Sequence, residues 1–452
     1  MSSILCRRRA RLVLVVAAAT SLAGCASFSP DGGFAPVEQT AQERLGKEVR
    51  WARSDADREA IARRVDALLA RPLAMDDAVQ LALLNNRGLQ AAFFELGIGE
   101  AELVQASRLP NPGFGFARLT RGDEIESRRF AQTQGRAALA VLELAADTRK
   151  AWVQAVAAQE TVRYRTQVMQ AAEASAELAR RMAQVGNFSK LQQAREQSFY
   201  ADAALNLARA QQAQLASRER LTRLLGLWGG QTGFRLPERL PDLPAAPQEL
   251  PDVERIALAQ RLDVQGERLA AEQTAKQLGL TRTTRFVNVL ELGIVRNSSN
   301  EAPVQRGWEI GFELPLFDWG TARVARAESV YRQSLERAAA TAINARSEVR
   351  EAYGAYRTAW DVAKHHRDEI VPLHQRIAEE NVLRYNGMLI GVFELLADAR
   401  AQIAGVNAAI DALRDFWLAQ ADLDMALIGK PGLAAAAAIS ANPPAEAGGA
   451  GH

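Results

Sequence analysis

One stretch, residues 146–227, constrains the fold more than any other part of the chain. It contains no proline, and its helical pattern is interrupted once, at Val185-Gly186-Asn187. On both sides of this interruption, residues recur at alternating steps of three and four, the spacing of a narrow coiled-coil seam. We therefore expect two antiparallel helices, each about 55 Å long at a rise of about 1.5 Å per residue. The expected seam consists of Trp152, Ala155, Gln159, Val162, Thr166 and Met169, followed after the turn by Leu191, Ala194, Ser198, Ala201, Leu205 and Ala208.

The same stretch occurs a second time along the chain. Trp152 aligns with Tyr353 and Gly186 aligns with Gly387, both at an offset of 201 residues. Further upstream, residues 82–90 align with residues 257–265 at an offset of 175. The chain is therefore a tandem duplication in which each half pairs a shorter helix with a long helical hairpin. Two repeats are fewer than the roughly three that a solenoid needs.

Composition excludes several classes of function. The net charge is +2 with 24% charged residues and no basic stripe, so nucleic acid is not an expected partner. We find no nucleophile constellation, glycine-rich phosphate loop or metal-ligand spacing, because the adjacent His365 and His366 would face two directions on a charged helix. We therefore expect neither enzymatic activity nor a cofactor nor a metal site.

The N-terminus carries a targeting signal. A basic segment is followed by a short apolar run over residues 12–22, which is too short to span a bilayer as a helix. The run ends in Leu22-Ala23-Gly24-Cys25, which resembles a bacterial lipobox. The alternative is an ordinary signal peptide that ends near a cysteine. We expect Cys25 to be lipidated, with palmitate as an acyl chain, and Ala26 to favour the outer membrane. Cys6 would leave with the signal, so the mature chain could form no disulfide.

The duplication and the ends divide the chain into six segments. Each repeat is expected to contain a short helix, a strand region and a long hairpin. The segments are a signal peptide (1–24), a lipidated N-terminal arm (25–74) with a helical piece around 57–69, a first repeat (75–235), a proline-rich extended connector (236–251), a second repeat (252–430) and a disordered tail (431–452).

Two strands are predicted in the second repeat, over residues 285–295 and 308–316, with a turn at 297–303 between them. In the second strand, apolar residues alternate with Glu, Gly and Pro, and each strand is about 10 residues long, the length that crosses a bilayer. The expected membrane-facing residues are Trp308, Ile310, Phe312 and Leu314. The alternative is a soluble hairpin with one wet face. Because a two-stranded hairpin alone is marginally stable, both interpretations require strands from other copies of the chain.

Several motifs together resemble the TolC-type outer-membrane efflux channels. They are the lipobox at Cys25, Asn111-Pro112 after the first helix, Pro315 to Gly320 after the last strand, and the paired turns at Gly186 and Gly387. The resemblance covers residues 75–429 and is closest to the lipoprotein members that serve RND-type tripartite pumps. It implies a mainly helical fold with a small β part, in which three copies each give four strands to one transmembrane barrel. It also implies a periplasmic helical tunnel that docks on an adaptor and, through it, on an inner-membrane pump.

The resemblance also assigns site residues. The hairpin turns would dock on the adaptor through Val185, Gly186, Asn187, Ser189, Asn386 and Gly387. The alternative is that these glycines simply end helices, and both can hold. Glu394 and Asp398 lie one helical turn apart and correspond to the carboxylates of the periplasmic constriction, where three copies would form an acidic ring. The alternative is an ordinary solvated face. The exported substrate is not encoded in these residues, because the pump selects it in this family.

One departure from the family pattern bears on function. The offset rises from 175 to 201 between Gln90 and Trp152, so the first half is 26 residues shorter there. This is the length of one returning strand plus the start of the next helix, and an open strand edge in lipid is costly. Two other functions therefore stay open. One is an envelope lipoprotein with a coiled-coil scaffold role and no working pore, and the other is a periplasmic adaptor, although the many short strands of an adaptor are missing.

Overall fold

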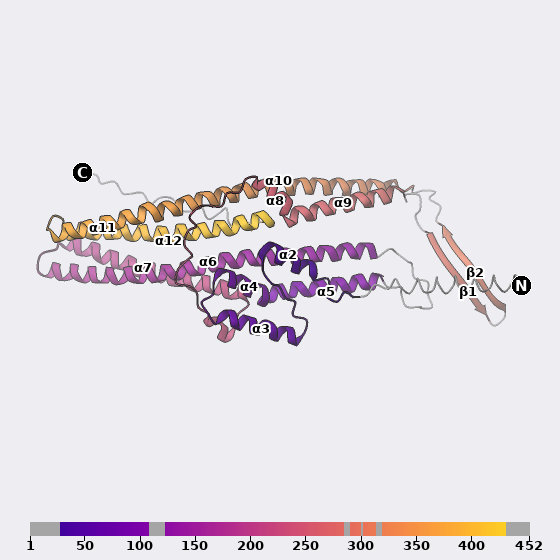
Figure 1. Ribbon diagram of the computed structural model, residues 1–452, viewed down its shortest axis with the longest axis horizontal. Coiled ribbons are helices and arrows are strands. Elements are labelled where there is room, and N and C mark those ends of the chain that lie inside the picture. Colours follow the sequence, from indigo (N-terminus) through magenta and orange to yellow (C-terminus); the bar gives the residue numbers. More distant parts are fainter. Residues whose placement is uncertain (1–27, 108–122, 284–289, 300–301, 313–318, 431–452) are drawn as a thin grey trace. The chain divides into compact units, whose positions relative to one another are not determined.

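The computed structural model describes residues 28–107, 123–283, 290–299, 302–312 and 319–430 (Figure 1). None of the helices in these ranges combines the length and the hydropathy that a bilayer-spanning helix requires. The elements in chain order are α2 (Ala35–Leu45), α3 (Asp55–Leu69), α4 (Met75–Asn85), α5 (Arg87–Ser107), α6 (Asp123–Gln184), α7 (Lys190–Leu225), η1 (Gly229–Gly233), α8 (Val253–Gln260), α9 (Leu262–Thr283), β1 (Leu290–Ser299), β2 (Ala302–Phe312), α10 (Thr321–His365), the π-helical turn η2 (His366–Ile370), α11 (Val371–Asn386) and α12 (Val392–Ile428).

The chain folds into two compact units. The described part of the first unit comprises residues 28–40, 91–138 and 266–340, and that of the second comprises residues 41–90, 139–265 and 341–430. The long helices α6 and α10 contribute to both units. This division does not follow the duplication, because each unit takes segments from both halves of the sequence.

In the first unit, the N-terminal segment packs along the helices. The Ser29 amide donates to Glu100 Oε1 at 2.6 Å, and the rings of Phe34 and Phe93 meet edge to face with centroids 4.8 Å apart. Gly33 has a φ of +72°, and an added Cβ would lie 2.2 Å from the ring of Phe130. Only glycine suits this position. The predicted arm therefore lies on the body here, and it contains a helix, α2, that the sequence pattern did not indicate.

The β-hairpin also belongs to the first unit. Its antiparallel register pairs Leu290 with Phe312, Leu292 with Ile310 and Ile294 with Trp308. Residues that pair directly in an antiparallel ladder lie on the same face. β1 runs to Ser299 and β2 begins at Ala302, so both strands extend into the stretch 297–303 where the sequence predicted a turn. Leu314 lies outside the described residues, as does the segment 108–122 where the strand region of the first repeat falls.

The short helix of each repeat is broken at equivalent positions, whereas the sequence pattern predicted one continuous helix. Asn86 separates α4 from α5 with φ −65° and ψ 121°, and Arg261 separates α8 from α9 with φ −65° and ψ 127°. In both, the amide of the joint residue donates to a carbonyl four residues earlier at 2.9 Å. Residues that align at the offset of 175 therefore also share the same backbone conformation at this joint.

The shortening of the first half lies between α5 and α6. Fifteen residues, 108–122, separate these helices, whereas 37 residues, 284–320, separate α9 from α10. Residues 124–129 lie within α6. The helices that flank the shorter segment, α5 and α6, correspond to α9 and α10 of the second half.

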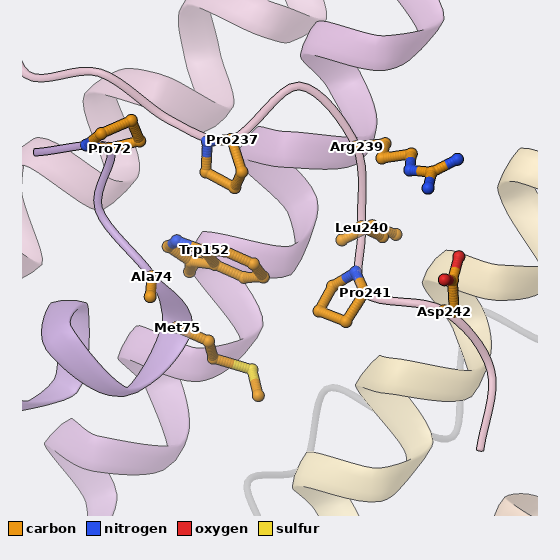
Figure 2. A pocket seen from close by; sticks show the side chains of 9 residues that line it. All are labelled: Pro72, Ala74, Met75, Trp152, Pro237, Arg239, Leu240, Pro241 and Asp242. Carbon is orange, nitrogen blue, oxygen red and sulfur yellow. The ribbon is translucent and has the colours of Figure 1, made fainter.

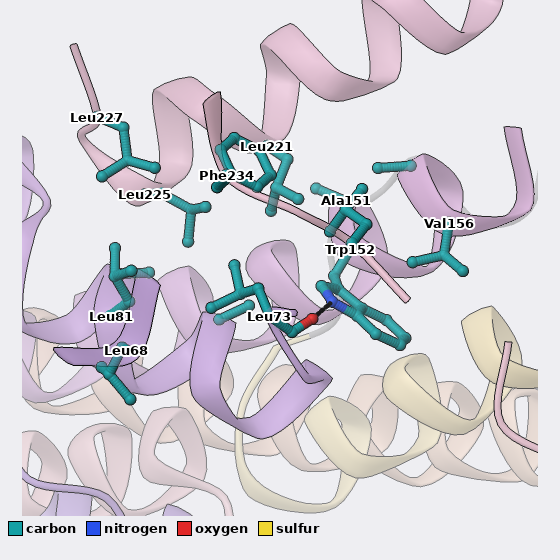
Figure 3. Close-up of a cluster of buried hydrophobic side chains, with 14 of the residues drawn as sticks. Leu68, Leu73, Leu81, Ala151, Trp152, Val156, Leu221, Leu225, Leu227 and Phe234 are labelled. Atoms are coloured by element: carbon teal, nitrogen blue, oxygen red, sulfur yellow. Dashed lines mark hydrogen bonds between the residues drawn. The ribbon is translucent and has the colours of Figure 1, made fainter. Parts of the chain in front are cut away.

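The core of the second unit surrounds Trp152, whose side chain is 1% exposed (Figure 3). It gathers residues from α3, α4, α6 and α7 and from the segment after α7, including Leu68, Leu81, Leu225 and Phe234. A second cluster, around Tyr356 and Phe416, joins α8, α10 and α12. Leu413 and Trp417 of α12 pack against both clusters. Burial of this size is the main favourable contribution to folding.

The proline-rich connector is held by tryptophan side chains of two long helices, α10 and α12. Proline has no N–H, so this segment cannot form a ladder of its own and leaves carbonyl groups to be satisfied. Trp417 Nε1 donates to the Pro241 carbonyl at 3.1 Å, and Trp360 Nε1 donates to the Pro244 carbonyl at 3.2 Å. Where the connector begins, the Arg235 carbonyl accepts from the Leu73 amide, and the Leu73 carbonyl accepts from Trp152 Nε1 at 2.8 Å.

Replacing Trp152 by Phe tests this arrangement. The substitution keeps an aromatic ring but leaves the Leu73 carbonyl buried without its donor, so we expect the free energy of unfolding to fall by about 1–3 kcal/mol. Equilibrium denaturation of the purified protein measures this change. Trp228→Phe is the matched control, because Trp228 is 76% exposed and should change stability little. Equal effects of the two substitutions would contradict the assignment.

Candidate functional site

The first hairpin turn is a Schellman motif. The Gly186 amide donates to the Ala183 carbonyl at 3.2 Å, and the Asn187 amide donates to the Met182 carbonyl at 2.9 Å. Gly186 has a φ of +83°, as expected for the left-handed residue of this motif. Ser189 caps α7, and its side chain and that of Gln192 form a capping box.

The second turn has the same motif, displaced by one residue. The Met388 amide donates to the Tyr385 carbonyl, and the Leu389 amide donates to the Arg384 carbonyl, both at 2.9 Å. Met388 therefore holds the left-handed position, with φ +57°, while Gly387 has φ −79°. The sequence alignment of Gly186 with Gly387 had placed the glycine itself there. A left-handed side-chain-bearing residue costs about 1 kcal/mol or more.

Both turns present apolar side chains to solvent. Met388 is 93% exposed, Leu389 77% and Val185 71%. Met388 and Leu389 are consecutive, so the second turn exposes a small continuous apolar surface, whereas the first turn exposes Val185. The predicted docking residues Val185, Gly186, Asn187, Ser189, Asn386 and Gly387 all lie in or beside these two turns.

The acidic pair near the second turn is not two equivalent free carboxylates. Glu394 is exposed in the first turn of α12, and no described hydrogen bond holds its side chain. Asp398 is half-buried, and its Oδ2 accepts a hydrogen bond from Asn381 Nδ2 on the neighbouring helix α11. The carboxylate of Asp398 is therefore oriented by a hydrogen bond within the hairpin, while the Glu394 side chain is exposed to solvent.

A buried charge network ties the two hairpins together close to this pair, and the sequence reasoning missed it. Glu196 of α7 is 2% exposed and accepts from Arg400 Nη2 of α12 at 2.6 Å and from Ser175 Oγ of α6 at 2.7 Å. The Arg400 guanidinium also lies 4.4 Å from the ring centroid of Phe199. Loss of the Arg400 side chain would leave the buried Glu196 carboxylate with the Ser175 hydroxyl as its remaining described partner.

This network also shows where the seam prediction was wrong. The residues expected to form the seam of α7, from Leu191 through Ala208, are exposed. Glu196 and Ala203, seven residues apart, are buried instead. The seven-residue spacing of Glu196 and Ala203 is typical of a coiled-coil seam, but the prediction did not place a glutamate in the seam. In α6 the prediction was better, because Trp152 and Ala155 are buried.

The remaining predicted positions add no second site. Cys25 lies outside the described residues, and of the membrane-facing set the structure describes the backbone of Trp308, Ile310 and Phe312. His365 Nδ1 lies 3.3 Å from Glu369 Oε2, and burial, followed by the nearby His365, lowers the pKa of His366. In the described ranges, no three His, Cys, Asp or Glu side chains are grouped to hold a metal.

A cavity of about 350 Å³ lies where the connector crosses the core of the second unit (Figure 2). Its walls are mainly apolar, formed by Trp152, Pro72, Pro237, Leu240 and Pro241, with Arg239 and Asp242 at its edge. No set of polar groups converges on it. It follows from the packing of prolines against an indole rather than from a catalytic arrangement.

Comparison with known proteins gives a consistent result at the level of fold. No family model and no curated protein matches the sequence significantly. Among solved structures, a membrane protein from Pseudomonas aeruginosa is similar with a TM-score of 0.66 and 17% identity, over 78% of this chain and 92% of that one. The Campylobacter jejuni CmeC outer membrane channel has a TM-score of 0.62 and 17% identity, covering 78% and 85%. The Neisseria gonorrhoeae MtrE outer membrane channel has a TM-score of 0.62 and 17% identity, covering 78% and 89%.

The two turn glycines provide a matched pair for a stability test. Gly186→Ala places a Cβ on a left-handed residue, so we expect a loss of about 1 kcal/mol in the free energy of unfolding. Gly387→Ala is accommodated without strain and should be neutral or stabilising by a few tenths of a kcal/mol, because alanine restricts the unfolded chain. Chemical denaturation of both variants measures the difference. Equal losses in both would contradict the displaced motif.

Proposed function

We propose that this chain, which has the fold of the TolC-type outer-membrane efflux channels, is the outer-membrane channel of a tripartite efflux system. In this role it is a passive exit duct and needs no catalytic group. The observation that carries the proposal is the extent of the shared fold, because similarity spans most of this chain and most of each outer membrane channel compared. The duplicated helical hairpins are part of that shared extent.

The proposed assembly is a homotrimer anchored in the outer membrane and extending into the periplasm. The lipobox supports a lipid anchor at Cys25. The alternating apolar residues of β2, with Leu314 beyond it, support a lipid-facing strand in a barrel that copies of the chain share. The exposed apolar groups at both turns support docking on a periplasmic adaptor, which would connect the duct to an inner-membrane pump.

Within this duct, we assign the constriction to Glu394 and Asp398. Three copies would bring six carboxylates together, and their mutual repulsion would oppose closure while attracting cations. The hydrogen bond from Asn381 supports a fixed position for Asp398. The ion pair between Arg400 and Glu196 supports a defined distance between the two hairpins just beyond the constriction, since it joins α12 to α7.

Single-channel recording in a planar bilayer tests the proposal. The detergent-extracted trimer should give discrete, cation-preferring openings. Glu394→Gln combined with Asp398→Asn should lower the cation preference, because each copy then loses two charges at the narrowest point. Asp202→Asn on α7 removes an exposed carboxylate elsewhere and serves as the control. Unchanged selectivity in the double variant would remove the constriction assignment, and absence of openings would remove the channel.

A second candidate function rests on the length of the segment between α5 and α6. Fifteen residues cannot hold two strands of the roughly 10 residues that cross a bilayer. A copy that supplies fewer strands leaves an edge unpaired in lipid, which is costly. The candidate is an envelope lipoprotein that keeps the helical scaffold of a channel but has no working pore.

Restoring the missing length distinguishes the two functions. Replacing residues 108–122 by a copy of residues 284–320 gives the first half the segment that the second half has. If the short segment prevents closure of the pore, the restored chain should conduct while the natural chain is silent. Equal conductance of both chains would exclude the scaffold function. Extraction supports the readout, because a membrane-embedded protein needs detergent even as the Cys25→Ser variant, whereas a tethered coiled coil becomes soluble.

A further inference from the structure

The second hairpin contains one residue more than the first on the way to its turn. Trp152 and Tyr353 are 201 residues apart, whereas the left-handed residues of the two turns, Gly186 and Met388, are 202 apart. The N-caps of the helices that follow, α7 and α12, are also 202 residues apart, so the turns themselves have equal length. The extra residue therefore lies between Tyr353 and Met388.

The π-helical turn η2 is the place that holds this residue. Of the described chain between Tyr353 and the second turn, residues 366–370 are the part that departs from α-helical geometry. The Val371 amide donates to the His366 carbonyl across η2, and such a bond spans five residues where an α-helix spans four. The corresponding part of α6 is α-helical throughout. The extra residue is therefore taken up in η2.

The face that α11 turns towards α12 changes at η2, and we call the choice of this face the register of α11. Three buried residues mark the inward face of α6: Val168, Ala172 and Ala179. Their counterparts at an offset of 202 are half-buried: Ile370, His374 and Asn381. Their counterparts at an offset of 201 are exposed: Glu369, Leu373 and Glu380. The π-helical turn thus decides which residues of α11 pack against α12.

The observed register is strained at both ends of α11. Met388 is left-handed with φ +57°, although the adjacent Gly387 can adopt that conformation without a steric cost. At the other end, a π-helical turn is a rare form of helix. If the extra residue moved from η2 into the turn, the helix would be α-helical throughout and Gly387 would take the left-handed position. Leu373, now 53% exposed, would then face α12.

Two contacts with α12 hold the observed register. Asn381 Nδ2 donates to Asp398 Oδ2, and His374 packs against Gly405, where an added Cβ would lie 2.8 Å from the imidazole ring. In the other register, Glu380 would take the place of Asn381 beside the Asp398 carboxylate, and like charges would oppose the move. No residue of α11, all of which the structure describes, is fully buried. Small opposing contributions therefore separate the two registers.

We propose that the second hairpin has two registers, which exchange when one residue moves between η2 and the turn at Met388. The observed register places an amide beside Asp398, and the second places a carboxylate there. The turn that exposes Met388 and Leu389 changes in the same step, so a partner that binds the turn in one register also sets the charge beside Asp398. This consequence for the constriction rests on the proposed channel, whereas the two registers do not.

Cysteine pairs in the full-length protein test for the second register. The observed register should link Asn381→Cys to Asp398→Cys, and the second register should link Glu380→Cys to Asp398→Cys. Glu379→Cys with Asp398→Cys is the control, because residue 379 faces away from α12 in both registers at about 100° per residue. Oxidation followed by peptide mapping of the monomer measures the three yields. A yield for the Glu380 pair no higher than that for the Glu379 pair would overturn the proposal.

Gly387→Ala, added to each cysteine pair, should suppress the second register selectively. The second register needs residue 387 in the left-handed conformation, which alanine adopts at a cost, so the yield of the Glu380 pair should fall about fivefold or more. The yield of the Asn381 pair should stay the same, because Gly387 has φ −79° in the observed register. An equal fall in both pairs would contradict the exchange of left-handed residues.

Deletion of one residue tests whether η2 holds the extra residue. Removing Glu369 should convert η2 to α-helix, keep the observed face of α11 towards α12 and abolish the link between Glu380→Cys and Asp398→Cys. Removing Arg165 from α6 is the matched control, because that helix has no residue to spare, and it should lower the unfolding temperature by about 5 °C or more relative to the Glu369 deletion. Equal losses would overturn the assignment. None of these readouts uses conductance, so failure here is distinct from failure of the channel.

Discussion

The second unit depends on hydrogen bonds between indole groups and a chain segment that cannot satisfy itself. The connector is rich in proline, so it exposes carbonyl groups and offers few amides. Trp360 and Trp417 donate to two of these carbonyls, and Trp152 donates to the Leu73 carbonyl beside its start. Gln159 of α6 donates to the Pro237 carbonyl, so the connector contacts α6 of the first half as well as α10 and α12 of the second. Ion pairs of Arg149 with Asp424 and of Lys150 with Asp422 add direct links between α6 and α12.

The two halves keep one backbone and differ in the chemistry placed on it. The helix joint has nearly the same dihedral angles at Asn86 and Arg261, yet the Asn86 side chain caps α5 whereas the buried Arg261 side chain forms ion pairs with Asp263 and Glu348. The turns share one hydrogen-bond pattern, yet the left-handed residue is glycine in one and methionine in the other. Divergence of this kind is expected where duplicated segments face different neighbours. A side chain must fit the residues that it contacts, whereas the backbone path can be kept by many different side chains.

The charged network near the second turn illustrates how the hairpins are held in register. A coiled-coil seam of small residues gives close approach but little specificity along its length, and a buried polar pair at one position can define it. Glu196 has this role in α7, with Arg400 of α12 and Ser175 of α6 as partners. The Asn381–Asp398 hydrogen bond acts similarly within the second hairpin. Polar groups thus set relative positions, while apolar burial supplies most of the stability.

The sequence by itself determined the duplication, the long helices, their turns, the strand hairpin and the extended connector. These features depend on local propensity and on periodicity, which are properties of neighbouring residues along the chain. Tertiary structure decided which face of α7 is buried, because a helix with small residues on several faces takes its orientation from the helices around it. It also decided the joints at Asn86 and Arg261 and the use of Met388 in place of Gly387, since these depend on hydrogen bonds and on packing between segments far apart in sequence.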